Sequence, residues 1–171
     1  MREAQRQLAA PCGLVVGAIC GVAGTFVSSA SLRGLLWGID GVALVIAGAL
    51  LTVYHFSRGN DLVASGFLVF VAGETLVLAT ASAPLNSSGP VFASGASLWA
   101  ASLVLVSVPR VMPLWVRIVA IVAAVLFAVV SAQLFLGQPL NALSRPLPFF
   151  AYPLLAATMM GWAWAHYRAA A

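Results

Sequence analysis

Two acidic residues lie inside long apolar stretches of this 171-residue sequence. Glu74 stands in "FLVFVAGETLVL" (Phe67–Leu78), where all eleven neighbours are uncharged, and Asp40 stands in "GLLWGIDGVALV" (Gly34–Val45). An ionised carboxylate at bilayer depth costs about 2.5–3.5 kcal/mol even on lenient insertion scales. Each acid therefore needs a proton, a partner group or water. Both are candidates for the polar core of a transport path.

Neighbouring residues offer each acid a partner. Thr75, and the close backbone approach that Gly73 permits, could supply hydrogen bonds to Glu74. Arg33 lies seven residues before Asp40 on the same helical face, so an ion pair is the structural alternative to a transport role for Asp40. We expect the two acids near one depth. If the glycines beside them face one another, the acids point to opposite sides.

A third group of polar residues follows at spacings of three: His55, Arg58 and Asp61. This spacing suits mutual hydrogen bonding, a helix cap or a pH-sensing gate, and we expect a cytoplasmic mouth here. The alternative is a solvated turn with a capping acid. His55 and Asp61 would also be the acid–base pair of a membrane enzyme acting on lipid.

Other catalytic and metal-binding patterns are absent from the sequence. It contains neither a GxSxG elbow nor an HExxH motif, and its glycine-rich stretches are not followed by GK[ST]. Cys12 and Cys20 are eight residues apart, which matches neither a CxxC pair nor a zinc site. We therefore expect no catalytic residue, no metal ion and no cofactor, and we do not favour an enzyme.

The composition indicates a protein whose solvent is lipid. The chain is 63% hydrophobic and 7% charged, whereas about a quarter of the residues in soluble domains are charged. The net charge of +4 comes from arginines that are not interleaved with stacking aromatic residues, so nucleic acid is not the expected partner. The expected partner is the lipid bilayer.

Six stretches are long enough to cross a hydrocarbon layer as helices, which needs roughly 20 mostly apolar residues. Their apolar runs are continuous rather than alternating, which favours helices over barrel strands. The connections are short, so we predict one all-α membrane domain over residues 1–171, a six-helix bundle. Asn86–Ser88 fits a glycosylation pattern, with an ordinary turn as the alternative. The predicted spans are Pro11–Ala30, Gly34–His55, Leu62–Ser82, Val91–Val108, Pro113–Phe135 and Pro148–His166.

The arginines predict the orientation of this bundle. Loops on the cytoplasmic side of a membrane carry an excess of basic residues. Six arginines fall on the side of the two termini and two on the other, so we expect a multi-pass plasma (inner) membrane protein with both termini in the cytoplasm. A cleavable signal peptide is the alternative for the first span, although its apolar core exceeds the usual 7–15 residues. The first group is Arg2, Arg6, Arg58, Arg110, Arg117 and Arg168, and the second is Arg33 and Arg145.

Glycines spaced by four or seven recur along the first three predicted spans. Such small-residue stripes let helix backbones approach closely. Their recurrence raises the hypothesis of duplicated helices, and two halves of three helices would form an inverted-topology repeat of the kind found in many transporters. The glycines are Gly13, Gly17, Gly21 and Gly24, then Gly41 and Gly48, then Gly66 and Gly73.

Two of these segments carry a resemblance to a known family. "GLLWGIDGVALVIAGALL" (Gly34–Leu51) and "LVASGFLVFVAGETLVL" (Leu62–Leu78) resemble the short repeats of HdeD-like acid-stress membrane proteins. The likeness covers about two helices and consists of small and apolar residues. It implies six spans and a stress-related membrane role.

These observations predict a small permease or channel for a small uncharged or cationic solute. Transport could be linked to protons through Glu74, with Asp40 and Thr75 beside it and His55, Arg58 and Asp61 at the mouth. The alternative is a non-catalytic membrane subunit or stress-related protein. Its small-residue faces would bind a partner chain or a second copy of itself.

Overall fold

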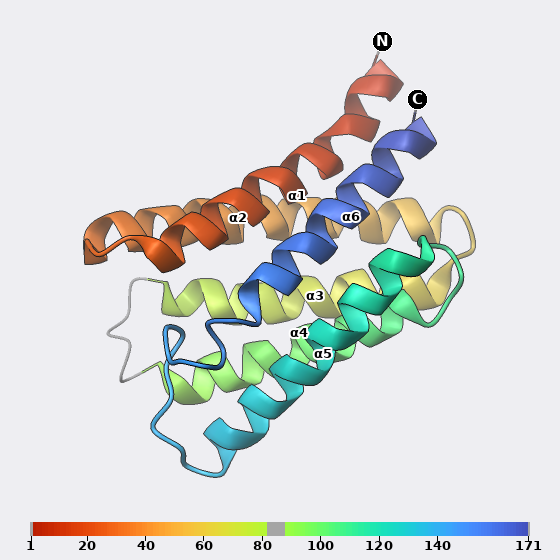
Figure 1. Cartoon of the computed structure of the whole chain (residues 1–171). Coiled ribbons are helices and arrows are strands. Elements are labelled where there is room, and N and C mark those ends of the chain that lie inside the picture. Colours follow the sequence, from red (N-terminus) through yellow and green to blue (C-terminus); the bar gives the residue numbers. More distant parts are fainter. Residues whose placement is uncertain (1, 82–87, 171) are drawn as a thin grey trace.

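The computed structural model describes residues 2–81 and 88–170, with side chains from Leu8 to Ala169 outside that gap, and in this part the chain forms six helices and no strand (Figure 1). The all-α prediction is confirmed. The expected loop around Asn86, and the side chains of Arg2 and Arg6, lie outside the described residues. The helices are α1 (Arg2–Phe26), α2 (Ala30–Phe56), α3 (Asp61–Thr80), α4 (Gly89–Ser107), α5 (Leu114–Phe135) and α6 (Tyr152–Ala170).

The helix ends differ most from the predicted spans in α1 and α6. α1 begins at Arg2 rather than at Pro11, because the polar start "REAQRQ" consists of good helix formers and extends the helix beyond its apolar part. α6 begins at Tyr152 rather than at Pro148, after a series of turns. Pro153 therefore lies in the first turn of α6, where its missing N–H costs no helical hydrogen bond.

Five of the helices, α1 to α5, are long and apolar enough to cross a membrane. α6 has a similar length, but its last turns carry His166, Tyr167 and Arg168. Many apolar side chains on the outside of the bundle, such as Val53 and Ile19, are more than half exposed, as expected for a surface that faces lipid. The chain is an all-α bundle of the membrane type.

The helices form a closed ring in chain order. Each helix packs against the next one along the chain, and α6 also packs against α1. Aromatic side chains from several helices fill the interior of this ring, because no backbone lies on its axis. The largest fully buried ones are Trp162, Phe67, Phe70, Phe92 and Phe127.

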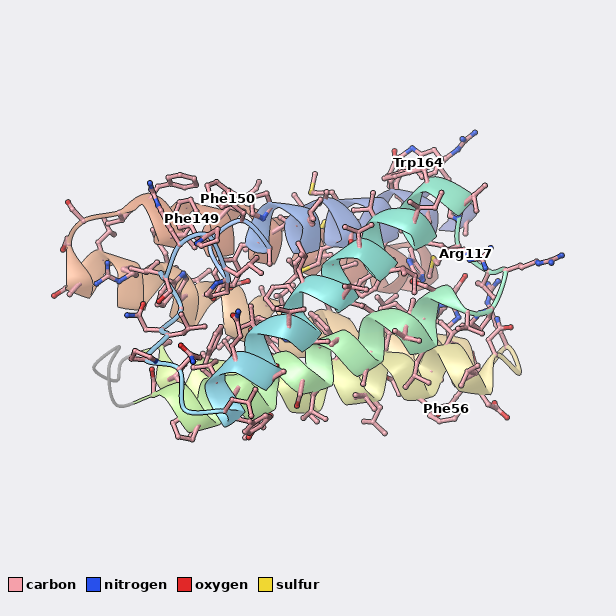
Figure 2. All side chains as sticks on the ribbon, turned by 60° about the horizontal axis from the view of Figure 1, so that its bottom comes forward. Phe56, Arg117, Phe149, Phe150 and Trp164 are labelled. Atoms are coloured by element: carbon pink, nitrogen blue, oxygen red, sulfur yellow. The ribbon has the colours of Figure 1, made fainter. Side chains whose placement is uncertain are left out.

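The two ends of the bundle are distinct. Both termini lie at one end, with the α2–α3 and α4–α5 connections, and we call this the terminal end (Figure 1). Figure 2 shows Phe56, Arg117 and Trp164 at the terminal end and Phe149 and Phe150 near the opposite end. Phe56, Trp164 and Phe150 are about half exposed. A half-exposed tryptophan such as Trp164 is typical of a membrane–water interface.

The glycine stripes of the first three helices each face the following helix. A Cβ on Gly21 would touch the Asp40 carboxyl of α2, and one on Gly41 would touch Leu78 of α3. A Cβ on Gly73 would lie 2.9 Å from the carbonyl oxygen of Gly95 in α4. The stripes of α2 and α3 therefore do not face one another, and these small-residue faces are used inside the chain.

We predict that Gly73→Ala destabilises the bundle. The added methyl group meets backbone, which cannot move aside as a flexible side chain can, so α3 and α4 must separate. The expected loss of unfolding free energy is about 1–3 kcal/mol, measured by denaturant titration in mixed micelles. Gly38→Ala is the matched control, because nothing lies within 4 Å of its added methyl group. Equal losses in the two variants would contradict the close packing of α3 on α4.

Candidate functional site

Asp40 and Glu74 line the same cavity, which has a volume of about 50 Å³. It lies between α1, α2, α3, α4 and α6, and the aromatic residues Trp37, Trp99 and Tyr152 also line it. A water molecule needs at least about 10–15 Å³ of such volume, so the cavity has room for water. We call it the acidic cavity.

Glu74 is held in the acidic cavity by the stripe of α3 that faces the ring interior. Val63, Phe67, Phe70 and Glu74 follow one another at steps of four, three and four residues, and all are buried. The side chain of Glu74 is 1% exposed. Trp99 of α4 donates a hydrogen bond from Nε1 to Glu74 Oε2 at 3.1 Å. This bond provides one oxygen of the buried carboxyl group with a hydrogen-bond donor.

Thr75 does not support Glu74 as expected. It is exposed, and its hydroxyl donates to the carbonyl oxygen of Ala72 in its own helix at 2.8 Å. The expectation was wrong because consecutive residues of a helix do not share a face. The sequence contained no direct sign of Trp99, which comes from a helix that packs beside α3.

Asp40 lies where α1 and α2 approach closely. Its carboxyl oxygens occupy the space that side chains at Gly17 and Gly21 would otherwise fill. Among the described groups, Oδ1 of Asp40 is buried without a hydrogen-bond partner. A buried acceptor without a partner is costly, so this oxygen can gain from a proton, a water molecule or a cation.

The expected ion pair between Arg33 and Asp40 does not form. Arg33 Nη1 donates instead to the carbonyl oxygen of Val27 at 3.2 Å, and its guanidinium group lies 5.8 Å from the centre of the Trp37 ring. Arg33 is in the first turn of α2, where carbonyl groups of the α1–α2 connection are closer to it than Asp40 is. Asp40 is therefore left without a basic partner among the described side chains.

The two acids share a cavity although they are not at one depth. Gly41 lies against Leu78 and Gly48 against Val71, so Glu74 is level with Val45, about 7 Å along α2 from Asp40. Because the glycine stripe of α3 faces α4 rather than α2, the acids are not forced apart. Both carboxyl groups therefore reach the acidic cavity. The glycine stripes therefore do not turn the two acids to opposite sides.

Tyr152 and Trp37 complete the wall of the cavity. Tyr152 begins α6 and lines the acidic cavity together with both acids. Trp37 packs against Gly24 and donates from Nε1 to the carbonyl oxygen of Gly21 at 3.3 Å. Trp37 stands one helical turn before Asp40, so its place near Asp40 could have been predicted from the sequence. No residue near Tyr152 in the sequence indicates that Tyr152 reaches the cavity.

A second buried polar group lies toward the terminal end, where His55 meets His166. Their Nε2 atoms are 3.0 Å apart, and the side chains are 2% and 7% exposed. The pair was missed, although each histidine ends a predicted span on the same side of the membrane. We call it the histidine pair.

The predicted mouth of His55, Arg58 and Asp61 does not form one cluster. His55 turns inward, whereas Arg58 stacks over Tyr54 at 4.3 Å and Asp61 is exposed in the first turn of α3. The spacing of three residues did not predict the contacts among these side chains. α2 ends at Phe56 and a turn follows, so the three residues do not lie on one helical face.

An aromatic layer separates the histidine pair from the acidic cavity. His55 stacks on Phe67 with ring centres 5.5 Å apart, and Trp162 packs edge-on against Phe67 and Phe70. Phe67 and Glu74 are seven residues apart on α3, about 10 Å along the helix. The interior thus has two polar sites with aromatic rings between them.

Within the described residues, no three histidine, cysteine, aspartate or glutamate side chains are grouped as a metal site would require. Comparison of the chain with protein-family models, curated proteins and solved structures finds no match. The resemblance to HdeD-like proteins therefore gains no support.

We predict that Trp99→Phe weakens the bundle by leaving Glu74 without its donor. A lost hydrogen bond to a buried group costs about 1–3 kcal/mol of unfolding free energy. A double-mutant cycle with Glu74→Leu isolates the pair, and the coupling between the two substitutions should have a similar size. Trp164→Phe, at a half-exposed tryptophan on the outside, is the control. Additive effects of Trp99→Phe and Glu74→Leu would contradict the bond.

Proposed function

We propose that the protein is a small permease or channel that passes a small cation, with proton linkage through Glu74. One observation carries this proposal. Two carboxyl groups from different helices line one cavity in a bundle whose outer surface is apolar. Ionisable residues at membrane depth are costly, and those that line a cavity mark ion and proton pathways.

The cavity wall favours a positively charged solute. Among the described residues that line it, Asp40 and Glu74 are the acidic ones and no arginine or histidine is present. Trp37, Trp99 and Tyr152 add aromatic rings, and the faces of such rings attract cations. An anion would meet only carboxyl groups and rings, so anion transport is disfavoured.

The size of the cavity limits the solute. About 50 Å³ accommodates water, a proton carried by water, or a monovalent cation such as ammonium. An uncharged solute of the same size fits by volume, but it leaves the two carboxyl groups unused. Sugars and amino acids exceed this volume in the conformation described here.

The proposed orientation places the terminal end in the cytoplasm of a cell bounded by this plasma membrane. Arg58, Arg110, Arg117 and Arg168 belong to that end, which fits the excess of basic residues on the cytoplasmic side. The hydrogen bonds of Arg117 hold its side chain at the terminal end. It donates to the carbonyl oxygens of Ser107 and Val108 at the end of α4.

The alternative is a subunit that binds partners through its small-residue faces. The packing of the helices does not support this role. The glycine stripes of α1, α2 and α3 are covered by helices of the same chain. A partner or a second copy would have to bind elsewhere on the apolar exterior.

We predict that Glu74→Gln and Asp40→Asn each lower cation-driven or proton flux by roughly tenfold or more, because each removes a group that can carry charge across the cavity. The measurement uses purified protein in vesicles with an internal pH dye, under imposed gradients of protons, ammonium, potassium or sodium.

Thr75→Val is the matched control for this experiment. Thr75 adjoins Glu74 in the chain, but its side chain is exposed and bonded to its own helix, so flux should stay at the wild-type level. Wild-type flux in Glu74→Gln, or no flux of any tested cation through the wild-type protein, would overturn the proposal.

A further inference from the structure

The histidine pair has a single arrangement of protons when both rings are neutral. His166 Nδ1 lies 2.7 Å from the carbonyl oxygen of Trp162, and a carbonyl oxygen only accepts, so Nδ1 carries the proton. Nε2 of neutral His166 is then an acceptor, and the proton between the rings belongs to Nε2 of His55. Nδ1 of His55 is left as a buried lone pair with no partner among the described groups.

We propose that the histidine pair is a proton-binding site that takes up one proton at His55 and places its charge on His166. The incoming proton binds Nδ1 of His55, and the proton on His55 Nε2 moves across the 3.0 Å contact to His166 Nε2. His55 ends neutral with its proton on Nδ1, and His166 ends as an imidazolium. One proton enters, and no other bond changes.

The pair holds one added proton and not two. Two imidazolium rings would each direct an N–H group at the other across 3.0 Å, with like charges inside the bundle. The charged group facing both rings is Arg58 of the α2–α3 turn, and Tyr54 packs its ring against both. Phe67 of α3, which stacks on His55, is apolar, and Trp162 of α6 packs on Phe67. The fixed charge of Arg58 therefore opposes a second proton.

The two histidines face different surroundings, which gives the transfer a direction. His166 lines a groove of about 410 Å³ at the terminal end, with Tyr54 and Arg58 in its wall, and His55 is not among the described residues lining it. His55 is stacked on the aromatic layer instead. A proton accepted at His55 on the interior side thus appears as charge on the wall of the groove.

This assignment deepens the proposed proton linkage and rests on it only for the direction of proton movement. The acidic cavity and the histidine pair would be two proton sites at successive depths, separated by the rings of Phe67 and Trp162. The pairing itself follows from the contacts of the two rings, so it can be tested without any measurement of transport.

Nitrogen NMR of the full-length protein, labelled at histidine and placed in lipid nanodiscs, tests the pair directly. The chain has two histidines, so His55→Gln and His166→Gln assign the signals. Near pH 8 we expect one ring protonated at Nδ1 and the other at Nε2. On acidification from about pH 8 to about pH 4, the wild-type pair should gain one proton in total, as each single variant does.

Several outcomes would overturn the proposal. They are two imidazolium spectra in the folded wild-type protein, the same tautomer in both rings near pH 8, or no proton uptake down to about pH 4. The wild-type titration decides the matter even if a variant fails to fold.

Flux measurements separate this proposal from the proposed function. His166→Gln should lower proton flux by roughly tenfold or more, whereas Tyr167→Phe, an exposed neighbour, should not. A one-proton pair with undiminished flux in His166→Gln would overturn the transfer step alone. Undiminished flux in Glu74→Gln would overturn the proposed function and leave the proton site standing.

Discussion

The cost of keeping two carboxyl groups away from water governs the interior of this bundle. A carboxyl group in an apolar medium needs a donor, a proton or a bound cation, and the chain supplies these unequally. Glu74 receives the indole N–H of Trp99, whereas Asp40 Oδ1 receives nothing from the described residues. Gly17 and Gly21 make room for Asp40 without offering it a hydrogen bond. The unsatisfied oxygen is retained beside an otherwise closely packed interface, which is the reason to regard the cavity as a site rather than a packing defect.

The aromatic layer gives the interior its second constraint. Phe67, Phe70 and Trp162 occupy the axis of the ring between the acidic cavity and the histidine pair. Passage of a solute between the two sites requires these rings to move, because close-packed side chains leave no room for one. Trp162 also links the regions chemically, since its carbonyl oxygen sets the tautomer of His166 while its ring packs on α3. The tilt of one helix, α6, would thus alter both the layer and the pair.

The fold was predictable from the sequence because hydrophobic length is a strong and local signal. Continuous apolar runs located all six helices, and the largest shifts are the start of α1, where polar helix formers extend the helix, and shifts of four residues at the end of α1, at the start of α2 and at both ends of α6. The residues of the site were found only in part. Asp40 and Glu74 stood out because a charge in an apolar run is conspicuous. Thr75 and Arg33 were chosen as partners because they are near in sequence, and both turned to backbone carbonyls of their own surroundings.

The groups that complete the site come from other helices, which no local pattern reveals. Nothing in the sequence marks Trp99 and Tyr152, which reach the acidic cavity only because α4 packs on α3 and α6 closes the ring against α1. His55 and His166 could have been paired from the sequence, since both end predicted spans on one side, but their contact depends on α6 closing the ring. The glycine spacing located the close faces correctly without telling which helix each one meets.

The serial arrangement of the glycine faces bears on how the protein is made. α1 presents its small residues to α2, α2 to α3, and α3 to α4, so each helix leaving the ribosome finds its docking surface on the one inserted just before it. Neighbouring helices can thus pack together in the order of synthesis, before more distant segments have been inserted. α6 is the exception, because it must pack against α1. Both polar sites include an α6 residue, so neither is complete until the last helix has been inserted.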